Sequence, residues 1–166
     1  MKKITPCLWF DNKAEEAAKF YVSLIKNSKL GSITHYGDEG AEASGRPAGT
    51  VMTVAFQLNG QEFLALNGGP QFTFSPAISF VVNCEKQEEI DKLWEQLSEG
   101  GEKNVCGWLT DKYGVSWQIV PAVLGEMMQD KDAEKAGRVM KAMLQMTKLD
   151  IKTLQRAYDG KQALAA

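Results

Sequence analysis

The chain repeats one pattern of strands and helices, and this internal duplication limits its possible folds more than any other feature of the sequence. When the sequence is shifted by about 72 positions, Thr5 falls on Ala77 and Leu8 falls on Phe80. In the two predicted helices, a shift of about 73 positions places Tyr21 on Trp94. We therefore predict two related modules within the 166 residues.

The first module begins with residues 4–10, whose apolar and polar side chains alternate as in a strand. Asn12 followed by Glu15 predicts the N-terminus of a helix, and apolar residues continue from there at helical spacing. Strand-like runs follow near residues 30–36, 50–58 and 61–67. Asn59-Gly60, between the last two runs, predicts a tight hairpin.

The second module has the same order of elements with shorter outer strands. Residues 77–82 alternate like the first strand, a helix is predicted from Lys86 to Ser98, and Gly100-Gly101 supplies its end. Further strand-like runs lie near residues 103–110 and 115–120. The predicted fold class is α+β, with βαβββ modules at residues 2–70 and 77–121 and a helical extension at residues 122–160.

The composition excludes several classes of protein. A hydrophobic content of 44% and a formal charge of −2 are ordinary for a soluble globular protein and give no basic surface for nucleic acid. No stretch approaches the roughly 18 apolar residues of a membrane span. The first residues reach Asp11 too early for the core of a signal peptide.

The three cysteines lack the spacing of a metal or redox motif. Cys7 and Cys106 fall inside predicted strands, and the number of cysteines is odd. We therefore predict reduced, mostly buried thiols and a cytoplasmic protein.

Three motifs in combination resemble one known family: WFDNKAEEAAKFYVSLI, PAISFVVNCEKQEEIDKLWEQLSEGG and CGWLTDKYGVSWQIVP. With the βαβββ duplication, they resemble the vicinal-oxygen-chelate superfamily, which includes glyoxalase I, bleomycin-resistance proteins and extradiol dioxygenases. Within it they look like the PhnB-like branch, often labelled 3-demethylubiquinone-9 3-methyltransferase. The resemblance covers about residues 2–121. It implies modules whose sheets curl into an open barrel around a cleft, often completed in a homodimer, and leaves open whether modules are exchanged.

Metal-using members of this superfamily bind the metal through four side chains in the cleft. Carried over by pattern, these positions fall on Thr5, Asn67, Ala77 and Gln118. Ala77 has no donor atom, and the other three are uncharged, so a divalent cation would lack compensating charge. His35, the only histidine, lies away from these positions. We therefore predict no metal site and no cofactor.

The same positions define a predicted ligand pocket. Alternation places Val115, Trp117 and Ile119 toward the helices and Gln118 toward the cleft. Gln118 is either a pocket amide that orients a polar ligand or a solvated side chain. Trp9 is either a wall for stacking or a core residue. The predicted pocket residues are Thr5, Cys7, Trp9, Phe63, Asn67, Ala77, Ser79 and Gln118.

Three segments remain open to interpretation. Residues 37–50 read as a mobile loop from which Arg46 reaches an anion, or as a plain connection. Residues 68–76 join the modules and carry Phe72 and Phe74. The tail reads as helices at residues 122–130, 132–146 and 151–159, with Asp132 and Asp150 as caps. Its methionine-rich stripe either packs on its own module or clamps a dimer.

Three functions are compatible with the sequence. The first is a metal-independent small-molecule-binding protein, and the second is an enzyme. A methyltransferase of the usual kind has a glycine-rich turn for S-adenosylmethionine, but the first strand here leads to Phe10-Asp11-Asn12-Lys13. Ala77 disfavours a metal-dependent lyase or dioxygenase. The third is a partner-binding module that docks through its C-terminal helices.

Overall fold

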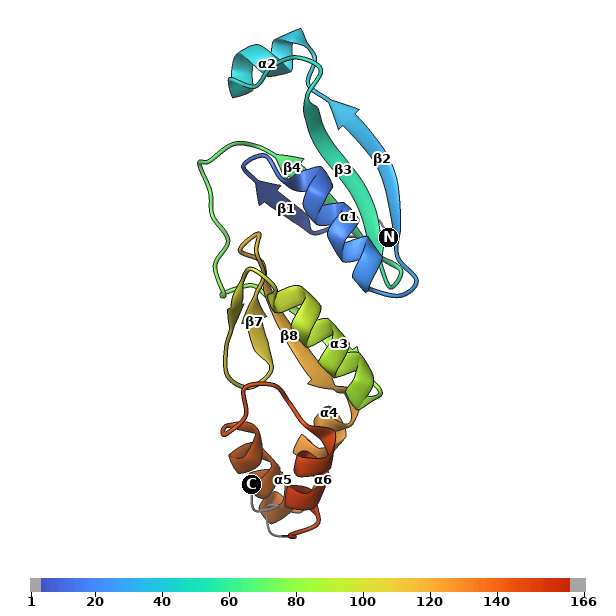
Figure 1. Ribbon diagram of the computed structural model, residues 1–166, viewed down its shortest axis with the longest axis vertical. Coiled ribbons are helices and arrows are strands. Elements are labelled where there is room, and N and C mark those ends of the chain that lie inside the picture. Colours follow the sequence, from blue (N-terminus) through green and yellow to red (C-terminus); the bar gives the residue numbers. More distant parts are fainter. Residues whose placement is uncertain (1–3, 162–166) are drawn as a thin grey trace. The chain divides into compact units, whose positions relative to one another are not determined.

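The computed structural model describes residues 4–161 and contains two compact units, which divide after Phe74. Each unit contains a four-stranded mixed sheet covered on one face by a helix (Figure 1). This architecture confirms the α+β class with two βαβββ modules and a helical extension. No helix among residues 4–161 has the length and apolar character to cross a membrane.

The first unit contains one long-stranded sheet. Its elements are β1 (Cys7–Phe10), α1 (Ala14–Leu24), β2 (Lys29–His35), α2 (Asp38–Ser44), β3 (Val51–Leu58) and β4 (Gln61–Asn67). The strands lie in the order β1-β4-β3-β2, with β1 parallel to β4 and the other pairs antiparallel.

The turn between β3 and β4 sets the register of this sheet. Asn59 and Gly60 both have positive φ angles, 46° and 82°, as a two-residue hairpin requires. Phe56 therefore lies opposite Phe63, and their rings stack with centroids 5.3 Å apart. Both belong to the buried face that packs on α1, where Tyr21 is fully buried.

The N-terminus of α1 differs from the sequence prediction. No side chain of the preceding loop caps it, so the predicted capping role of Asn12 is wrong. Instead the Asn67 side chain, at the end of β4, accepts a hydrogen bond from the Ala14 backbone N–H at 2.8 Å. A residue distant in sequence thus satisfies one of the free N–H groups at this helix end.

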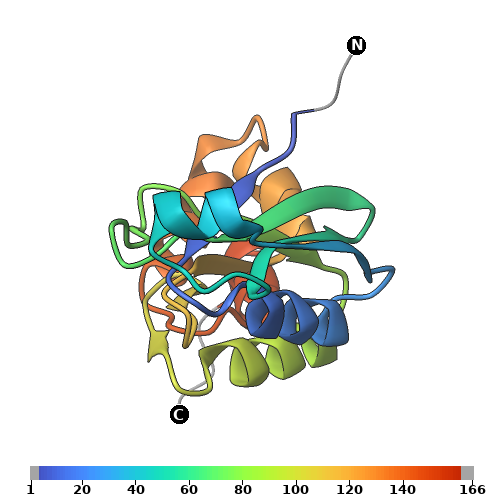
Figure 2. The ribbon, with the colours of Figure 1, turned by 90° about the horizontal axis from the view of Figure 1, so that it is seen from above.

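Part of the segment predicted as a mobile loop forms the short helix α2. This helix lies beyond the ends of β2 and β3 (Figure 1) and away from α1 (Figure 2). Arg46, which follows α2, donates to both the backbone oxygen and the carboxylate of Asp11. The guanidinium therefore has an acidic partner within its own unit.

The second unit repeats the arrangement with shorter strands. Its elements are β5 (Phe80–Cys84), α3 (Gln87–Ser98), β6 (Glu102–Lys103), β7 (Trp108–Thr110), β8 (Ser116–Pro121), α4 (Ala122–Met128), α5 (Ala133–Met143) and α6 (Ile151–Tyr158). The strand order is β5-β8-β7-β6, with β5 parallel to β8.

The predicted strand at residues 103–110 is interrupted between β6 and β7. Cys106 and Gly107 have φ angles of 59° and 80°, which a strand does not adopt. Their backbone N–H groups donate to the carbonyls of Met146 and Thr147. The interruption thus joins the second sheet to the segment between α5 and α6.

A buried carboxylate organises the turn between β7 and β8. Asp111 is only 3% exposed, and its side chain accepts hydrogen bonds from the Tyr113 and Val115 backbone N–H groups. Its other oxygen accepts from the indole N–H of Trp117 at 2.8 Å. Trp117 and Ile119 are buried, as their alternation predicted.

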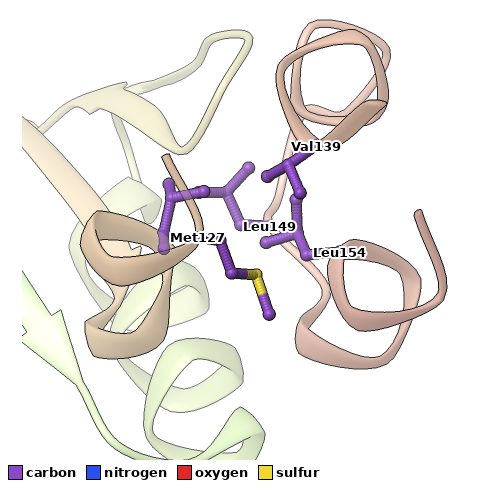
Figure 3. Packing of buried hydrophobic residues seen from close by; sticks show 5 residues of the cluster. Met127, Val139, Leu149 and Leu154 are labelled. Atoms are coloured by element: carbon purple, nitrogen blue, oxygen red, sulfur yellow. The ribbon is translucent and has the colours of Figure 1, made fainter. Parts of the chain in front are cut away.

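The C-terminal helices pack against one another and against the second module. Asp132 and Asp150 cap α5 and α6, as predicted. Gln87 of α3 donates to the Leu149 carbonyl and accepts from the Ile151 N–H. The apolar cluster between these helices contains Leu124, Met127, Val139, Leu149 and Leu154 (Figure 3). These contacts agree with the interpretation of the tail as a cap on its own module. A role of the tail in dimerisation stays a prediction.

Candidate functional site

The face of the first sheet opposite α1 carries three rows of side chains across the strands. One polar row consists of Lys29, Gln57 and Glu62, which lie side by side on β2, β3 and β4. The next row consists of Gly31, Ala55, Leu64 and Cys7. The third contains Thr34, Thr53, Leu66 and Trp9, and the two threonine hydroxyls are 2.6 Å apart. We call this surface the first open face.

A hollow of about 500 Å³ lies on this face. Its lining residues are Thr5, Lys29, Gly31, Ala55, Phe56, Gln57, Glu62, Phe63 and Leu64. Thr5 and Phe63 are the two predicted pocket residues among them. The remaining lining residues were not predicted from the sequence, although the Asn59-Gly60 turn predicts the pairing of Gln57 with Glu62.

Two more predicted residues lie on the same face near the hollow. Cys7 is exposed, contrary to the prediction of mostly buried thiols, and is paired with Leu64. Desolvation raises the pKa of its thiol, so the reactive thiolate is disfavoured at neutral pH. The Trp9 indole N–H donates to the Gly69 carbonyl, and its ring meets Phe72 edge-on at 5.0 Å. The Trp9 indole N–H is therefore engaged within its own unit.

Asn67 does not lie on the first open face, which corrects its predicted place in the pocket. It is 4% exposed and shares the α1-facing side of β4 with Phe63 and Ala65. Its amide nitrogen donates to the Val51 carbonyl at 3.0 Å, while its oxygen accepts from Ala14. Both ends of the amide are engaged in holding α1 and β3.

The second sheet presents a smaller open face. Gln118 and Ser79 meet there, with the Gln118 amide nitrogen donating to the Ser79 hydroxyl at 2.9 Å. Val81 and Trp108 are paired with Gln118 from either side, and Val81 is 52% exposed. Ala77 is exposed and precedes β5. Gln118 therefore lies on the side of the sheet that its alternation predicted, with one neighbouring hydroxyl as its partner.

The predicted metal positions offer a poor set of donors. Thr5 contributes a neutral hydroxyl, Asn67 has its amide oxygen committed to Ala14, and Ala77 has no donor. Within residues 4–161, no three His, Cys, Asp or Glu side chains lie close enough to hold a metal ion. Divalent transition metals prefer imidazole, thiolate or carboxylate ligands, so this set of side chains does not fit such an ion.

A family model described as 3-demethylubiquinone-9 3-methyltransferase matches residues 2–120. The chain is a member of this family. The match confirms the predicted PhnB-like resemblance, and it covers both βαβββ modules of the chain. No protein of curated function matches the chain.

Solved structures agree with this family membership. A putative 3-demethylubiquinone-9 3-methyltransferase, PhnB protein, from Bacillus cereus is 42% identical over 73% of this chain and 100% of its own, with a TM-score of 0.65. The protein PA1353 from Pseudomonas aeruginosa is 22% identical over 70% of this chain and 95% of its own, with a TM-score of 0.56, and shares the fold. The family match ends at residue 120, so helices α4, α5 and α6 lie outside it.

Proposed function

We propose that this PhnB-like protein binds a small organic molecule in the hollow of the first open face, without a metal ion. The observation that carries the proposal is the hollow itself, of about 500 Å³, which has apolar, hydroxyl, amide and charged side chains around it. Ligand sites in proteins commonly combine a concave apolar surface with a few polar groups that fix orientation.

Metal independence is supported by the chemistry of the predicted ligand positions. A threonine hydroxyl, an alanine and two amides supply no negative charge, and a dication in a partly desolvated site needs such charge. Elemental analysis of the purified protein tests this part of the proposal. Stoichiometric nickel, zinc, iron or manganese, lost in a Gln118→Ala variant, would contradict it and would favour a lyase-like or dioxygenase-like enzyme.

A thermal-shift screen of metabolites tests ligand binding, because a ligand that binds only the folded state raises the melting temperature. The variant Ala55→Leu fills the hollow, and Val81→Leu makes the same kind of enlargement on the open face of the second sheet. We expect at least one compound to stabilise the wild type and Val81→Leu while leaving Ala55→Leu unshifted. Equal shifts in all three proteins would place the ligand elsewhere and contradict the proposal.

Methyl transfer is the second candidate function. It is favoured by the family description and by the printed name of the Bacillus cereus relative. The loop after β1, at Asp11 to Lys13, lacks the glycines that most S-adenosylmethionine-binding folds place after their first strand. Isothermal calorimetry with S-adenosylmethionine separates the two functions: micromolar binding supports a methyltransferase, and no heat of binding supports a binding protein.

The protein is further proposed to be a cytoplasmic homodimer that binds neither nucleic acid nor membranes. The formal charge of −2 supports the absence of nucleic acid among its ligands. Free rather than disulfide-bonded cysteines suit a reducing compartment. Sedimentation equilibrium measures the assembly directly, and a single monomeric species at micromolar concentration would contradict the dimer.

A further inference from the structure

The polar row beside the hollow contains both a positive and a negative side chain. Lys29 is paired with Gln57, which is paired in turn with Glu62. Neighbouring strands lie about 4.8 Å apart, so the backbones that carry the two charges are roughly 10 Å apart. The row therefore presents an ammonium at one end, an amide in the middle and a carboxylate at the other end.

We propose that the hollow selects dipolar small molecules, of the α-amino-acid type, that carry an ammonium and a carboxylate on one end of an apolar body. This inference rests on the proposed function, because it names the class of ligand for the same hollow. The ligand carboxylate lies toward Lys29, its ammonium lies toward Glu62, and its apolar body extends over Ala55 and Leu64.

The charges of the row are free to receive such a ligand. Among residues 4–161, the Lys29 ammonium makes neither a hydrogen bond nor an ion pair with another side chain. Glu62 receives one long hydrogen bond, from the Gln57 amide nitrogen at 3.5 Å. Such a long bond is weak, so it costs little to exchange it for a charge-assisted bond to a ligand ammonium.

The floor of the hollow suits a narrow apolar body. Gly31 has no side chain, and a Cβ atom there would lie 3.1 Å from the Ala55 carbonyl oxygen and 3.3 Å from the Ala55 Cβ. Because these two small residues lie close together, the row of Gly31, Ala55 and Leu64 forms a shallow depression beside the polar row. Leu64 extends this depression as an apolar surface. Burial of a ligand methylene on such a surface contributes to affinity through the hydrophobic effect.

The mixed charge of the row disfavours ligands with a single charge. A simple carboxylate attracted by Lys29 is also repelled by Glu62, and a simple amine meets the opposite combination. A dipolar molecule satisfies both ends at once, so complementary charge gives specificity against either half of the molecule.

Three matched probes test this selectivity. Norleucine carries both charges, hexanoate lacks only its ammonium, and pentylamine lacks only its carboxylate. Binding is followed by the ¹³C-methyl signals of Ala55 and Leu64 during titration of the full chain. We expect norleucine to bind at least about fivefold more tightly than hexanoate or pentylamine, since each charge-assisted hydrogen bond adds affinity.

Two variants assign the ends of the ligand. Lys29→Met should weaken the binding of norleucine and hexanoate at least about threefold, because one exposed charge pair is lost. The binding of pentylamine should not change. Glu62→Gln is expected to weaken norleucine and pentylamine while sparing hexanoate. Lys141→Met and Glu42→Gln remove exposed charges on α5 and α2, neither of which lines the hollow, and serve as matched controls with unchanged affinities.

The outcomes separate this inference from the proposed function. Equal binding of hexanoate and norleucine, or unchanged norleucine affinity in both variants, overturns the dipolar ligand. Shifts of Ala55 and Leu64 with an uncharged probe such as benzyl alcohol, but with none of the three matched probes, overturn it while the proposed function stands. If these methyl signals respond to no compound and change only with protein concentration, the face is a contact between copies and both proposals fail.

Discussion

The two βαβββ modules share one plan but differ in how a buried polar side chain completes each of them. In the first, the Asn67 amide joins the start of α1 to β3, and the opposite face of the sheet carries a hollow. In the second, the Asp111 carboxylate organises the turn before β8, and helices α4 to α6 extend the module. The difference shows that a duplicated framework keeps its apolar core positions while its buried hydrogen-bonding groups diverge.

The largest effect should come from the anchor of the second module. Asp111→Ala leaves two backbone N–H groups and the buried Trp117 indole N–H without their acceptor, at a cost of about 3 kcal/mol in the free energy of unfolding. Asp111→Asn keeps one acceptor oxygen and should lose roughly half as much. Urea unfolding monitored by tryptophan fluorescence measures both. Equal stability of wild type and Asp111→Ala would show that this carboxylate is no anchor.

The junction between the second sheet and its helices should be almost as sensitive. Gly107 has a φ angle of 80°, and an added Cβ would lie 2.7 Å from the Ile119 carbonyl oxygen. Gly107→Ala should cost at least about 2 kcal/mol, because it combines left-handed strain with a clash against backbone. Gly100→Ala is the matched control: its φ is 73°, but the nearest atom is the Lys112 Cβ at 3.4 Å. Equal losses in a thermal melt would mean that strain alone matters and the junction does not.

The anchor of the first module should contribute less than that of the second, because fewer groups depend on it. Asn67→Ala leaves the Ala14 N–H and the Val51 carbonyl unpaired, and we expect a loss of about 2 kcal/mol. Asn67→Asp keeps the acceptor for Ala14 and should retain slow hydrogen exchange at the start of α1. Loss of protection at Ala14 in both variants would contradict the capping role of the side-chain oxygen.

A smaller effect is expected where α3 meets the C-terminal helices. Gln87→Ala removes the hydrogen bonds to the Leu149 carbonyl and from the Ile151 N–H, at a net cost of about 1 kcal/mol. Hydrogen exchange should accelerate at Ile151 and remain unchanged at Ala14 in the other module. Unchanged exchange at Ile151 would show that the helices are held by their apolar cluster alone.

The smallest effect concerns the pH dependence of the C-terminal helices. The Tyr158 hydroxyl donates to the Asp130 carboxylate and lowers the pKa of that carboxyl from its usual range near about 4. A carboxyl group whose pKa is lowered by folding stabilises the folded state at pH values above its pKa in the unfolded chain. This stabilisation is lost as the pH falls through the pKa of the group in the folded protein. Tyr158→Phe should therefore be slightly less stable than wild type at pH 7, and the gap should close as pH falls below the lowered pKa. A gap independent of pH, in melts from pH 7 downward, would contradict this.

The architecture was predictable because the apolar alternation and the helical stripes repeat in both halves of the sequence. Tyr21 and Trp94, matched by the internal repeat, are both buried beneath their sheets. The interruption at Cys106 and Gly107 was not predictable, because it depends on hydrogen bonds to residues 146 and 147, far along the chain. The helix α2 was missed because its glycine and alanine content is also typical of a loop.

The candidate site was predictable only in part. Thr5 and Phe63 are among the lining residues of the hollow, but the Phe63 side chain belongs to the α1-facing side of β4. Asn67 belongs to the same side, and it was placed in the pocket because the end of the strand was matched to a family pattern. The two-residue turn at Asn59-Gly60 could have prevented this error, because it pairs Phe56 with Phe63 and so fixes the register of β4. A shift of one residue in that register would move Asn67 to the opposite face of the sheet. Lys29 was not predictable as a member of the same row as Gln57 and Glu62, since the pairing of β2 with β3 has irregular register.

Methyl chemical-shift mapping of both sheets during titration with a stabilising ligand tests the central claim most directly. The claim is that the first open face binds the ligand and that the face around Gln118 does not. We predict that the Ala55 and Leu64 methyl signals move first and saturate together, while the Val81 methyl signals stay fixed. Movement of Val81 with Ala55 and Leu64 unchanged would contradict the account and assign binding to the second sheet.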